Sequence, residues 1–366
     1  MPLTIVIAPD SFKGSLSAAE VAEAIAAGWR EVRPQDALIL MPQADGGEGT
    51  LDAVEAMVTG TTRHEIGDVT GPDGRPTPGV WLELPGGVAV VELAQSSGLP
   101  LMATPDAMGA TTRGLGEVIR AALDAGAQSL VIGLGGSAST DAASGALMAL
   151  GLRLADDRGH PIADGGRALA AIAGIDTGAL RKPGKVTLLS DVANPLLGPT
   201  GAAATFGPQK GASPAQVVEL DAALAHFAGQ FGGNPSAAGA GAAGGAAWGF
   251  ATAWGATIVP GANYLAELSG LSAAVNNADL VVTGEGRFDE QSFGGKVVGH
   301  LLLTAARVRV PVGVIAGQVA VDTELWATSL TELAGSVEAA LADTTAWLRV
   351  AGATAARELG SANQSA

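Results

Sequence analysis

The chain has 366 residues and no cysteine, and its 20 basic and 36 acidic side chains give a formal net charge of −16 at pH 7. This charge argues against nucleic acid and anionic membrane surfaces as partners, because both need a basic surface. The lack of cysteine excludes disulfides, thiolate catalysis and cysteine-ligated metals. The first residues have no basic region and no long apolar run, and no apolar stretch reaches the roughly 18 residues of a membrane span, so we expect a cytoplasmic protein.

Short runs of β-branched residues alternate with helical patterns along most of the chain, which indicates an α/β protein with a parallel sheet. Thr4–Ala8 is a predicted buried strand, and the capping box Ser17-x-x-Glu20 predicts a helix that runs to about Trp29. The predicted strands are 4–8, 37–41, 80–84, 88–93, 129–134, 186–190, 278–283 and 311–316, and the predicted helices are 17–29, 50–58, 115–125, 141–150, 214–231 and 333–359.

The composition of the sequence changes at Gly71–Gly79, a run of mainly glycine, proline and aspartate that is typical of turns. We interpret this run as the start of a second domain. The predicted architecture is a Rossmann-like parallel-sheet domain formed by both chain ends, residues 1–70 and 285–366, with an α/β domain inserted at residues 71–284 and a site in the cleft between them. Gly232–Gly245, mostly glycine and alanine, is predicted either as a flexible linker or as a place of close backbone approach.

Five of the predicted strands end in polar or glycine-rich loops. Ligands of open α/β sheets bind outside the carboxyl ends of the strands, so five such loops that point the same way would form one site. Ordinary turns between strands and helices also favour glycine and aspartate, and for any single loop this alternative stays open. The loops are 9–15, 43–50, 135–141, 191–195 and 284–289.

The chain has five lysines, and three of them, Lys13, Lys210 and Lys296, lie beside glycine in predicted loops. A compact ammonium group next to bare backbone N–H groups suits a phosphate. The glycine loop Gly133–Ala138 also matches the pattern G-x-G-x-x-G/A between a strand and a helix. Three interpretations of this loop stay open, namely a dinucleotide fingerprint, a phosphate-binding turn and plain turn chemistry.

Six segments carry a family resemblance and follow one another in the expected order from residue 5 to about residue 317. They are Ile7–Ser17, Ala44–Thr50, Gly133–Ala138 with Thr140 and Asp141, Asp191–Pro199, Phe206–Ala212, and Thr283–Asp289 with Gln291, Gly295 and Lys296. Together these segments resemble the type 1 glycerate kinase family. The departures are small, with Ala193 where threonine is usual and Phe288 and Phe293 in place of aliphatic residues. The tail after Gly317 is less characteristic.

The resemblance implies ATP-dependent phosphorylation of D-glycerate at the 2-hydroxyl, which gives 2-phosphoglycerate, in a two-domain α/β enzyme. Magnesium is the expected metal, because oxygen ligands are plentiful in the chain. Phosphorylation at the 3-hydroxyl is the alternative reaction. From another class, the Gly133–Ala138 loop would suit an NAD(P)-dependent hydroxy-acid oxidoreductase. A two-lobed binding protein for a small hydroxy acid is the non-catalytic alternative.

Phosphoryl transfer needs groups that position the reactants and neutralise their charge. Lys13 would neutralise the γ-phosphoryl group of ATP, and Arg287 would bind the glycerate carboxylate or steady the group in transfer. We assign the triphosphate to a glycine turn and two lysines, which are Gly135, Gly136, Ser137, Lys210 and Lys296.

The acidic residues of these segments have complementary hypothetical roles. Asp10 and Ser11 would hold the substrate hydroxyls, Asp191 would be the general base because it ends a strand before a rigid Asn-Pro pair, and Asp45 and Glu48 would bind magnesium. Exchanging the roles of Asp10, Asp45 and Asp191 would not conflict with the sequence. Since both substrates are anions and the chain is acidic, the cations must gather locally, so we expect a basic cleft on an acidic body.

Overall fold

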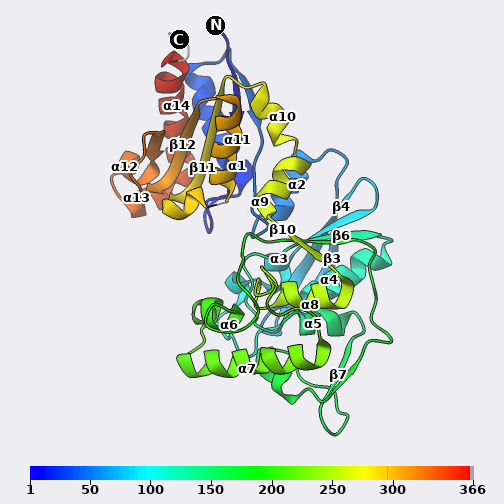
Figure 1. The fold of residues 1–366 in the computed structure, drawn as a ribbon. Coiled ribbons are helices and arrows are strands. Elements are labelled where there is room, and N and C mark those ends of the chain that lie inside the picture. Colours follow the sequence, from blue (N-terminus) through cyan, green and yellow to red (C-terminus); the bar gives the residue numbers. More distant parts are fainter. Residues whose placement is uncertain (295, 363–366) are drawn as a thin grey trace. The chain divides into compact units, whose positions relative to one another are not determined.

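The computed structural model describes residues 1–294 and 296–362, so Gly295 of the last family segment and residues 363–366 lie outside the described residues. The chain divides into two compact units (Figure 1). Unit 1 comprises Met1–Asp45, Asp52–Thr59 and Ala262–Ala366, and unit 2 comprises Gly46–Leu51 and Gly60–Gly261. Each unit combines helices with a sheet, which confirms the α/β prediction. Within the described ranges, no helix is long and apolar enough to cross a membrane.

Unit 1 is built on a five-stranded parallel sheet with the order β13-β12-β11-β1-β2, so both ends of the chain join one parallel sheet as predicted. Its strands are β1 (Thr4–Ile7), β2 (Ala37–Leu40), β11 (Leu280–Phe288), β12 (Val312–Val319) and β13 (Trp326–Ser329). Its helices are α1 (Ala18–Val32), α2 (Thr50–Met57, which begins in unit 2), α9 (Gly261–Leu268), α10 (Leu271–Asn276), α11 (Val297–Val308), α12 (Leu330–Ala334), α13 (Val337–Ala342) and α14 (Thr344–Ala362), with a 3₁₀ turn at Glu290–Phe293.

Helices cover both faces of this sheet. Ile5 and Ile7 of β1 belong to a core shared with α1 and α14, whereas Val6 and Ala8 belong to a core shared with α10 and α11. Successive side chains of a strand point to opposite faces, which explains this division. The helices that follow the neighbouring strands β1 and β11, namely α1 and α11, therefore cover opposite faces. Such a topological switch point is where open α/β sheets form a ligand-binding crevice.

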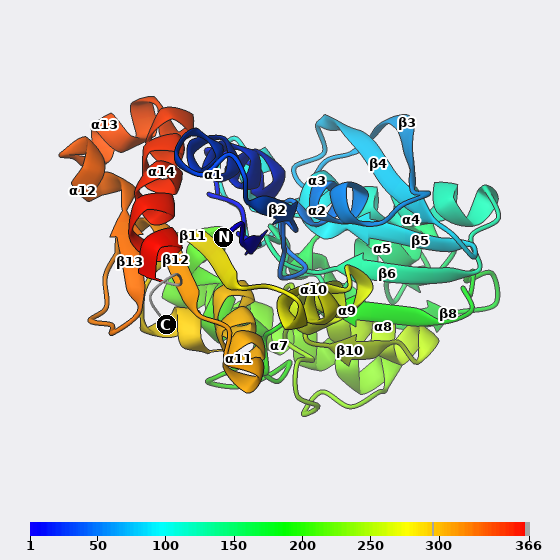
Figure 2. The same cartoon turned by 90° about the horizontal axis from the view of Figure 1, so that it is seen from above.

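The helices α1 and α14 lie side by side in Figures 1 and 2, in blue and red. The predicted capping box begins α1, since Ser17 Oγ accepts a hydrogen bond from Glu20 N while the Glu20 carboxylate accepts one from Ser17 N. Glycine lets the two backbones touch, because a Cβ atom on Gly28 would overlap the carbonyl oxygen of Arg349. The core on this face of the sheet depends on the close approach of the two helices.

Unit 2 is built on a six-stranded mixed sheet with the order β10-β9-β6-β5-β4-β3, in which the pairs β3–β4 and β4–β5 are antiparallel and the other pairs are parallel. Its strands are β3 (Thr62–Thr70), β4 (Pro76–Leu84), β5 (Val88–Glu92), β6 (Ser129–Gly133), β9 (Val186–Leu189) and β10 (Thr257–Val259), with a separate pair of β7 (Arg153–Ala155) and β8 (Gly174–Asp176). Its helices are α3 (Leu93–Ser97), α4 (Arg113–Asp124), α5 (Ser144–Ala149), α6 (Ala202–Phe206), α7 (Pro214–Phe231) and α8 (Ala246–Trp254), with 3₁₀ turns at Leu99–Leu101, Gly166–Ala171 and Pro208–Lys210.

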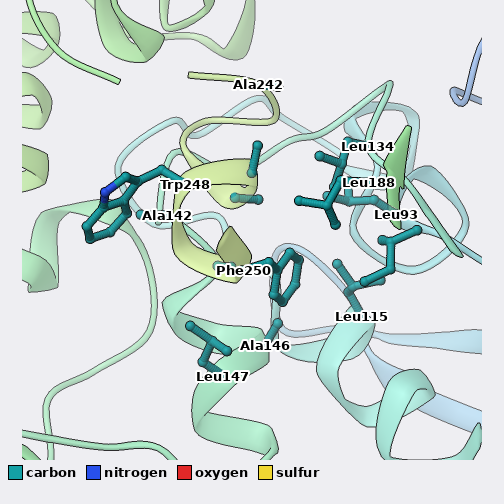
Figure 3. Close-up of a cluster of buried hydrophobic side chains, with 14 of the residues drawn as sticks. Leu93, Leu115, Leu134, Ala142, Ala146, Leu147, Leu188, Ala242, Trp248 and Phe250 are labelled. Carbon is teal, nitrogen blue, oxygen red and sulfur yellow. The ribbon is translucent and has the colours of Figure 1, made fainter. Parts of the chain in front are cut away.

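The core of unit 2 consists mainly of aliphatic side chains, and Figure 3 shows Trp248 and Phe250 of α8 among leucines and alanines. The segment Gly232–Gly245 packs into this unit, and Ala240 and Ala242 are each 1% exposed. A Cβ atom on Gly244 would overlap the carbonyl oxygen of Ser139. Close backbone approach is therefore the correct interpretation of this segment, and the flexible-linker alternative is wrong.

Some element boundaries differ from the predicted ones. The two compact units divide near residues 59 and 261, whereas the predicted domains divide at 70 and 284. Residues 60–70 belong to unit 2, because β3 pairs with β4 in the sheet of that unit. Residues 262–284, which include α10 and the first part of β11, belong to unit 1 and not to the inserted domain.

The predicted loop 284–289 is mostly strand, because β11 keeps pairing with β12 as far as Phe288 opposite Val319. The tail forms three helices rather than one.

Candidate active site

A pocket of about 450 Å³ lies at the carboxyl ends of the strands of unit 1 and includes the switch point between β1 and β11. Each strand contributes to its lining, at or just beyond its end. The pocket brings together six of the predicted site residues, which are Asp10, Ser11, Lys13, Asp45, Arg287 and Lys296. The expectation that polar segments at strand ends converge is therefore confirmed for the loops after β1 and β2 and for the carboxyl end of β11.

Asp10 is held where the chain leaves β1, next to the central strand β11. Asp10 N donates to Gly284 O at 2.8 Å, and Ser11 N donates to the Asp10 carboxylate at 2.7 Å. Burial raises the pKa of Asp10 to about 7, and repulsion from Asp45 adds to this rise, while the Ser11 N–H and Lys13 oppose it. This carboxyl therefore changes its protonation state near neutral pH, which is the property of an efficient general base.

Three cations line the pocket with their charges accessible. The Lys13 ammonium lies 4.0 Å from the Asp45 carboxylate, and its side chain is 59% exposed. Arg287 is 62% exposed and forms an ion pair with Asp289 at 3.3 Å. Lys296 is exposed as well. Exposed pairs of this kind are weak, so these cations are available to an anionic ligand.

The charge of the pocket is more balanced than the predicted basic cleft. Three carboxyls, those of Asp10, Asp45 and Glu285, stand against the three cations, so the lining is formally neutral when all are ionised. Burial raises the pKa of Asp10 and of Glu285. Because the pKa of Asp10 is about 7, partial protonation of this carboxyl at neutral pH shifts the lining toward positive charge, while the whole chain carries −16.

Glu285 is a pocket residue to which the sequence alone assigned no role. Within the part of the chain that the structure describes, its Oε1 atom is buried without a hydrogen-bond partner, as is Oγ of Ser11. Buried polar atoms without partners in a pocket are candidates for contacts with a ligand. The signal was present in the run Thr283–Asp289, where the arginine was assigned a role and the glutamate was not.

The Gly133–Ala138 loop lies in unit 2 and has a structural explanation. β6 ends at Gly133 and α5 begins only at Ser144, so the loop does not lead directly into a helix as a dinucleotide fingerprint requires. Gly135 N already donates to Gly46 O, and Ala138 N donates to Ser97 O. The glycines also let the backbone of residues 46–47 approach closely. The dinucleotide interpretation is therefore not favoured.

Lys210 is buried behind this loop and is only 1% exposed. Its ammonium group donates to Ser137 Oγ at 2.8 Å and to Ser139 O at 2.6 Å. Burial lowers the pKa of Lys210 to about 7, and the negative charge of buried Asp141 opposes this shift. Lys210 thus fixes the shape of the loop from inside unit 2.

Replacing Lys210 with methionine should change how stability depends on pH. The unfolded chain holds the lysine proton up to its usual pKa, whereas the folded chain releases it near pH 7, so the wild-type free energy of unfolding should rise between about pH 7 and 10. Urea unfolding of Lys210→Met should show a flatter rise, and Lys182→Met, at an exposed lysine of the same unit, should keep the wild-type slope. Equal slopes for all three proteins would contradict the buried ammonium.

Two acidic residues with predicted roles in the site also lie in unit 2. Asp191 is exposed, and its carboxylate accepts a hydrogen bond from Gly261 N at 3.0 Å. Glu48 is exposed and belongs to unit 2, whereas its predicted magnesium-binding partner Asp45 belongs to unit 1. Residues 1–294 and 296–362 contain no group of three or more histidine, aspartate or glutamate side chains placed to hold a metal ion. The predicted site residues that lie in unit 2 are Glu48, Gly135, Gly136, Ser137, Asp191 and Lys210.

A parallel sheet whose switch point gathers cations and a carboxyl with a near-neutral pKa is typical of an enzyme that acts on small anions. The chain belongs to the glycerate kinase family, whose family model matches residues 5–360. It is 42% identical to a glycerate kinase of Bacillus subtilis (strain 168), with 88% of this chain and 86% of the relative covered. It is 41% identical to a glycerate 2-kinase of Escherichia coli (strain K12), with 87% and 86% covered. A crystal structure described as a putative glycerate kinase 2 from Salmonella typhimurium LT2 superposes with a TM-score of 0.83 at 38% identity and covers 100% of both chains.

Proposed function

We propose that this enzyme transfers the γ-phosphoryl group of ATP to the 2-hydroxyl of D-glycerate, which gives 2-phosphoglycerate and ADP. The observation that carries the proposal is the unit 1 pocket, where Lys13, Arg287 and Lys296 lie together with Asp10. The names of the relatives from Bacillus subtilis and Escherichia coli support glycerate as the acceptor, and the second name supports the 2-position.

The proposed binding roles follow from charge and geometry. The planar guanidinium of Arg287 suits the glycerate carboxylate, which it can bind through two parallel hydrogen bonds. Lys13 and Lys296 are point charges that suit the phosphates, and Ser11 Oγ is a buried hydroxyl available to the acceptor. The turn of Gly135 to Ser137 stays a predicted phosphate contact of unit 2.

We infer that Asp10, rather than Asp191, takes the proton of the acceptor hydroxyl. The hydroxyl oxygen forms a bond to the γ-phosphorus, the bond from that phosphorus to the bridging oxygen of ADP breaks, and the hydroxyl proton passes to the Asp10 carboxylate. Asp10 lies in the same pocket as the proposed acceptor-binding groups, and its pKa of about 7 keeps a large ionised fraction at neutral pH. Asp191 is exposed, belongs to unit 2 and does not line this pocket.

Magnesium suits the donors of this pocket. Mg²⁺ prefers oxygen ligands and is held in phosphotransferases by one or two carboxylates together with substrate phosphates and water. Asp45, with Glu285 and its unpartnered Oε1, would supply that carboxylate contact, so a three-acid site within the protein is not needed. When bound, the ion would neutralise charge on the β- and γ-phosphates. Glu48 stays a predicted ligand from unit 2.

Proton-coupled ³¹P NMR of a reaction with D-glycerate and MgATP tests the function and its position. A phosphate on carbon 2 has one neighbouring C–H proton and gives a doublet, whereas a phosphate on carbon 3 has two and gives a triplet. We expect a doublet together with the signals of ADP. A triplet would support the alternative 3-phosphorylation, and no new ester signal would refute the proposal.

Replacing Arg287 with methionine should raise the KM for glycerate by roughly tenfold to a hundredfold, because a charged hydrogen bond contributes about 1.5–3 kcal/mol. The KM for ATP should change much less. Arg307→Met removes the same charge from an exposed position on α11 outside the pocket and should leave both constants unchanged. Steady-state kinetics with each substrate varied in turn measures both effects, and equal KM increases for the two substrates would contradict a carboxylate-binding role.

A further inference from the structure

The unit 1 pocket is larger than glycerate needs. Its volume is about 450 Å³, and residues at or beyond the carboxyl ends of all five strands line it, from Asp45 after β2 to Leu330 and Thr331 after β13. A three-carbon acid fills only a small part of this volume, and the rest of the pocket needs another explanation.

The polarity of the lining changes along the pocket. The charged groups come from the loops and strand ends of β2, β1 and β11. At the β13 end, by contrast, the lining is apolar and includes Leu330, Val337 and Leu341. Val337 and Leu341 lie four residues apart on α13, hence on one face of that helix, and they are 38% and 64% exposed. The apolar wall is thus accessible and continuous with the charged region.

We propose that the β13 end of the pocket binds the base and ribose of the nucleotide, with its phosphates directed toward the cations. This inference rests on the proposed function, in which ATP is the phosphoryl donor. A nucleoside triphosphate is elongated, with an anionic end and a flat apolar base, and this polarity matches the lining from Lys13 and Lys296 to Leu341. Ligand pockets commonly combine such an apolar wall with a few polar groups.

Polar groups beside the apolar wall suit a nucleoside. The Gln318 carboxamide lines the pocket on β12 and offers both a donor and an acceptor to the edge of a base. The floor is held in place, because Thr331 Oγ1 donates to Gly317 O at 2.9 Å and the hydroxyls of Ser15 and Thr344 hydrogen-bond at 2.8 Å. The second of these bonds ties the loop after β1 to the start of α14, so the two sides of the pocket are connected.

The test replaces Leu341 with asparagine, which is neutral and does not disturb the charge felt by the phosphates. Leu303→Asn is the matched control, because Leu303 is 59% exposed on α11 and does not line the pocket. Thermal unfolding first establishes that both variants fold like the wild type. The readouts are the KM for MgATP, the KM for glycerate and the dissociation constant of ADP by calorimetry, which needs no turnover.

We expect Leu341→Asn to raise the KM for ATP and the dissociation constant of ADP about tenfold, as the loss of one buried apolar contact would. Its KM for glycerate should stay within about twofold of the wild type, and Leu303→Asn should match the wild type in all three. A rise confined to the glycerate KM would assign the wall to the acceptor and overturn the proposal, as would equal behaviour of the two variants. Wild-type enzyme that neither binds ADP nor uses ATP would instead refute the proposed function itself.

Discussion

Replacing Asp10 with asparagine is expected to lower kcat by about 10²–10³-fold, because a positioned general base typically contributes a factor of this size. The substitution keeps the shape of the side chain and its acceptor oxygen for the Ser11 N–H, whose distance to the carboxylate is 2.7 Å. The loss should therefore fall on the chemical step, with KM for either substrate changed by only a few-fold. Steady-state kinetics at saturating MgATP and glycerate measures this separation.

The pH profile gives a second readout of the same group. A base must be ionised, so kcat/KM of the wild type should rise with pH through about 7 and then level off, since burial raises the pKa of Asp10 to about 7. Asp45, Lys13 and Glu285 surround this carboxyl, and each contributes to that value. Asp10→Asn should lack the rising limb.

The variant Asp191→Asn decides between the two candidate bases. Asp191 is exposed in unit 2, and we expect its asparagine variant to keep kcat within about threefold of the wild type and to retain the rising limb. The opposite pattern, with a large loss for Asp191→Asn and a small one for Asp10→Asn, would return the role of base to Asp191, as predicted from its place at the end of a strand.

Much of the unit 1 pocket was predictable because parallel strands end at the same edge of a sheet. Asp10, Lys13, Asp45 and Arg287 all follow or end strands that the sequence shows, so their convergence needs only the rule that ligands bind at carboxyl ends. The division of the five loops between two sheets was not predictable. Strand order decides it, and strand order depends on pairings between residues that are far apart in the chain.

Lys210 shows why a residue's role could not be inferred from its neighbours in the sequence. Glycine beside lysine is compatible both with an exposed phosphate site and with a buried ammonium group that binds carbonyl and hydroxyl oxygens. The structure shows the second arrangement, in which the Lys210 ammonium group donates hydrogen bonds to Ser137 Oγ and Ser139 O. The desolvation that lowers its pKa depends on the packing of unit 2 around it, and local sequence does not encode that packing.

The helices illustrate the same distinction between local and distant causes. The bounds of α7, Pro214–Phe231, agree with the prediction because Ser213 caps its start and Gly232 ends it, and both signals are local. The predicted helix 333–359 is interrupted, because Gly335 adopts a left-handed conformation and Ser336 caps the next helix, α13. Those signals are also present in the sequence, but they lie within a tail whose strongly helical composition favours one continuous helix.

For Gly28→Ala in α1, helix propensity and tertiary structure predict opposite changes in the free energy of unfolding. Propensity alone would stabilise the protein by about 1 kcal/mol, because glycine is a poor helix former. At this position, however, the new Cβ atom would overlap the carbonyl oxygen of Arg349 on α14, and backbone cannot move aside as a flexible side chain can. We expect a net loss of about 3 kcal/mol in the free energy of unfolding, since forced overpacking costs that much when helices must separate.

The matched control is Gly229→Ala in α7, an exposed helical glycine whose Cβ position has no heavy atom within 4 Å. Only the propensity effect operates there, so Gly229→Ala should be stabilised by about 0.5–1 kcal/mol. Urea unfolding followed by tryptophan fluorescence compares the two, because buried Trp29 reports on unit 1 and buried Trp248 reports on unit 2. If both variants were stabilised alike, α1 and α14 could not be as close as the structure has them, and the core that they share with β1 would have to be repacked.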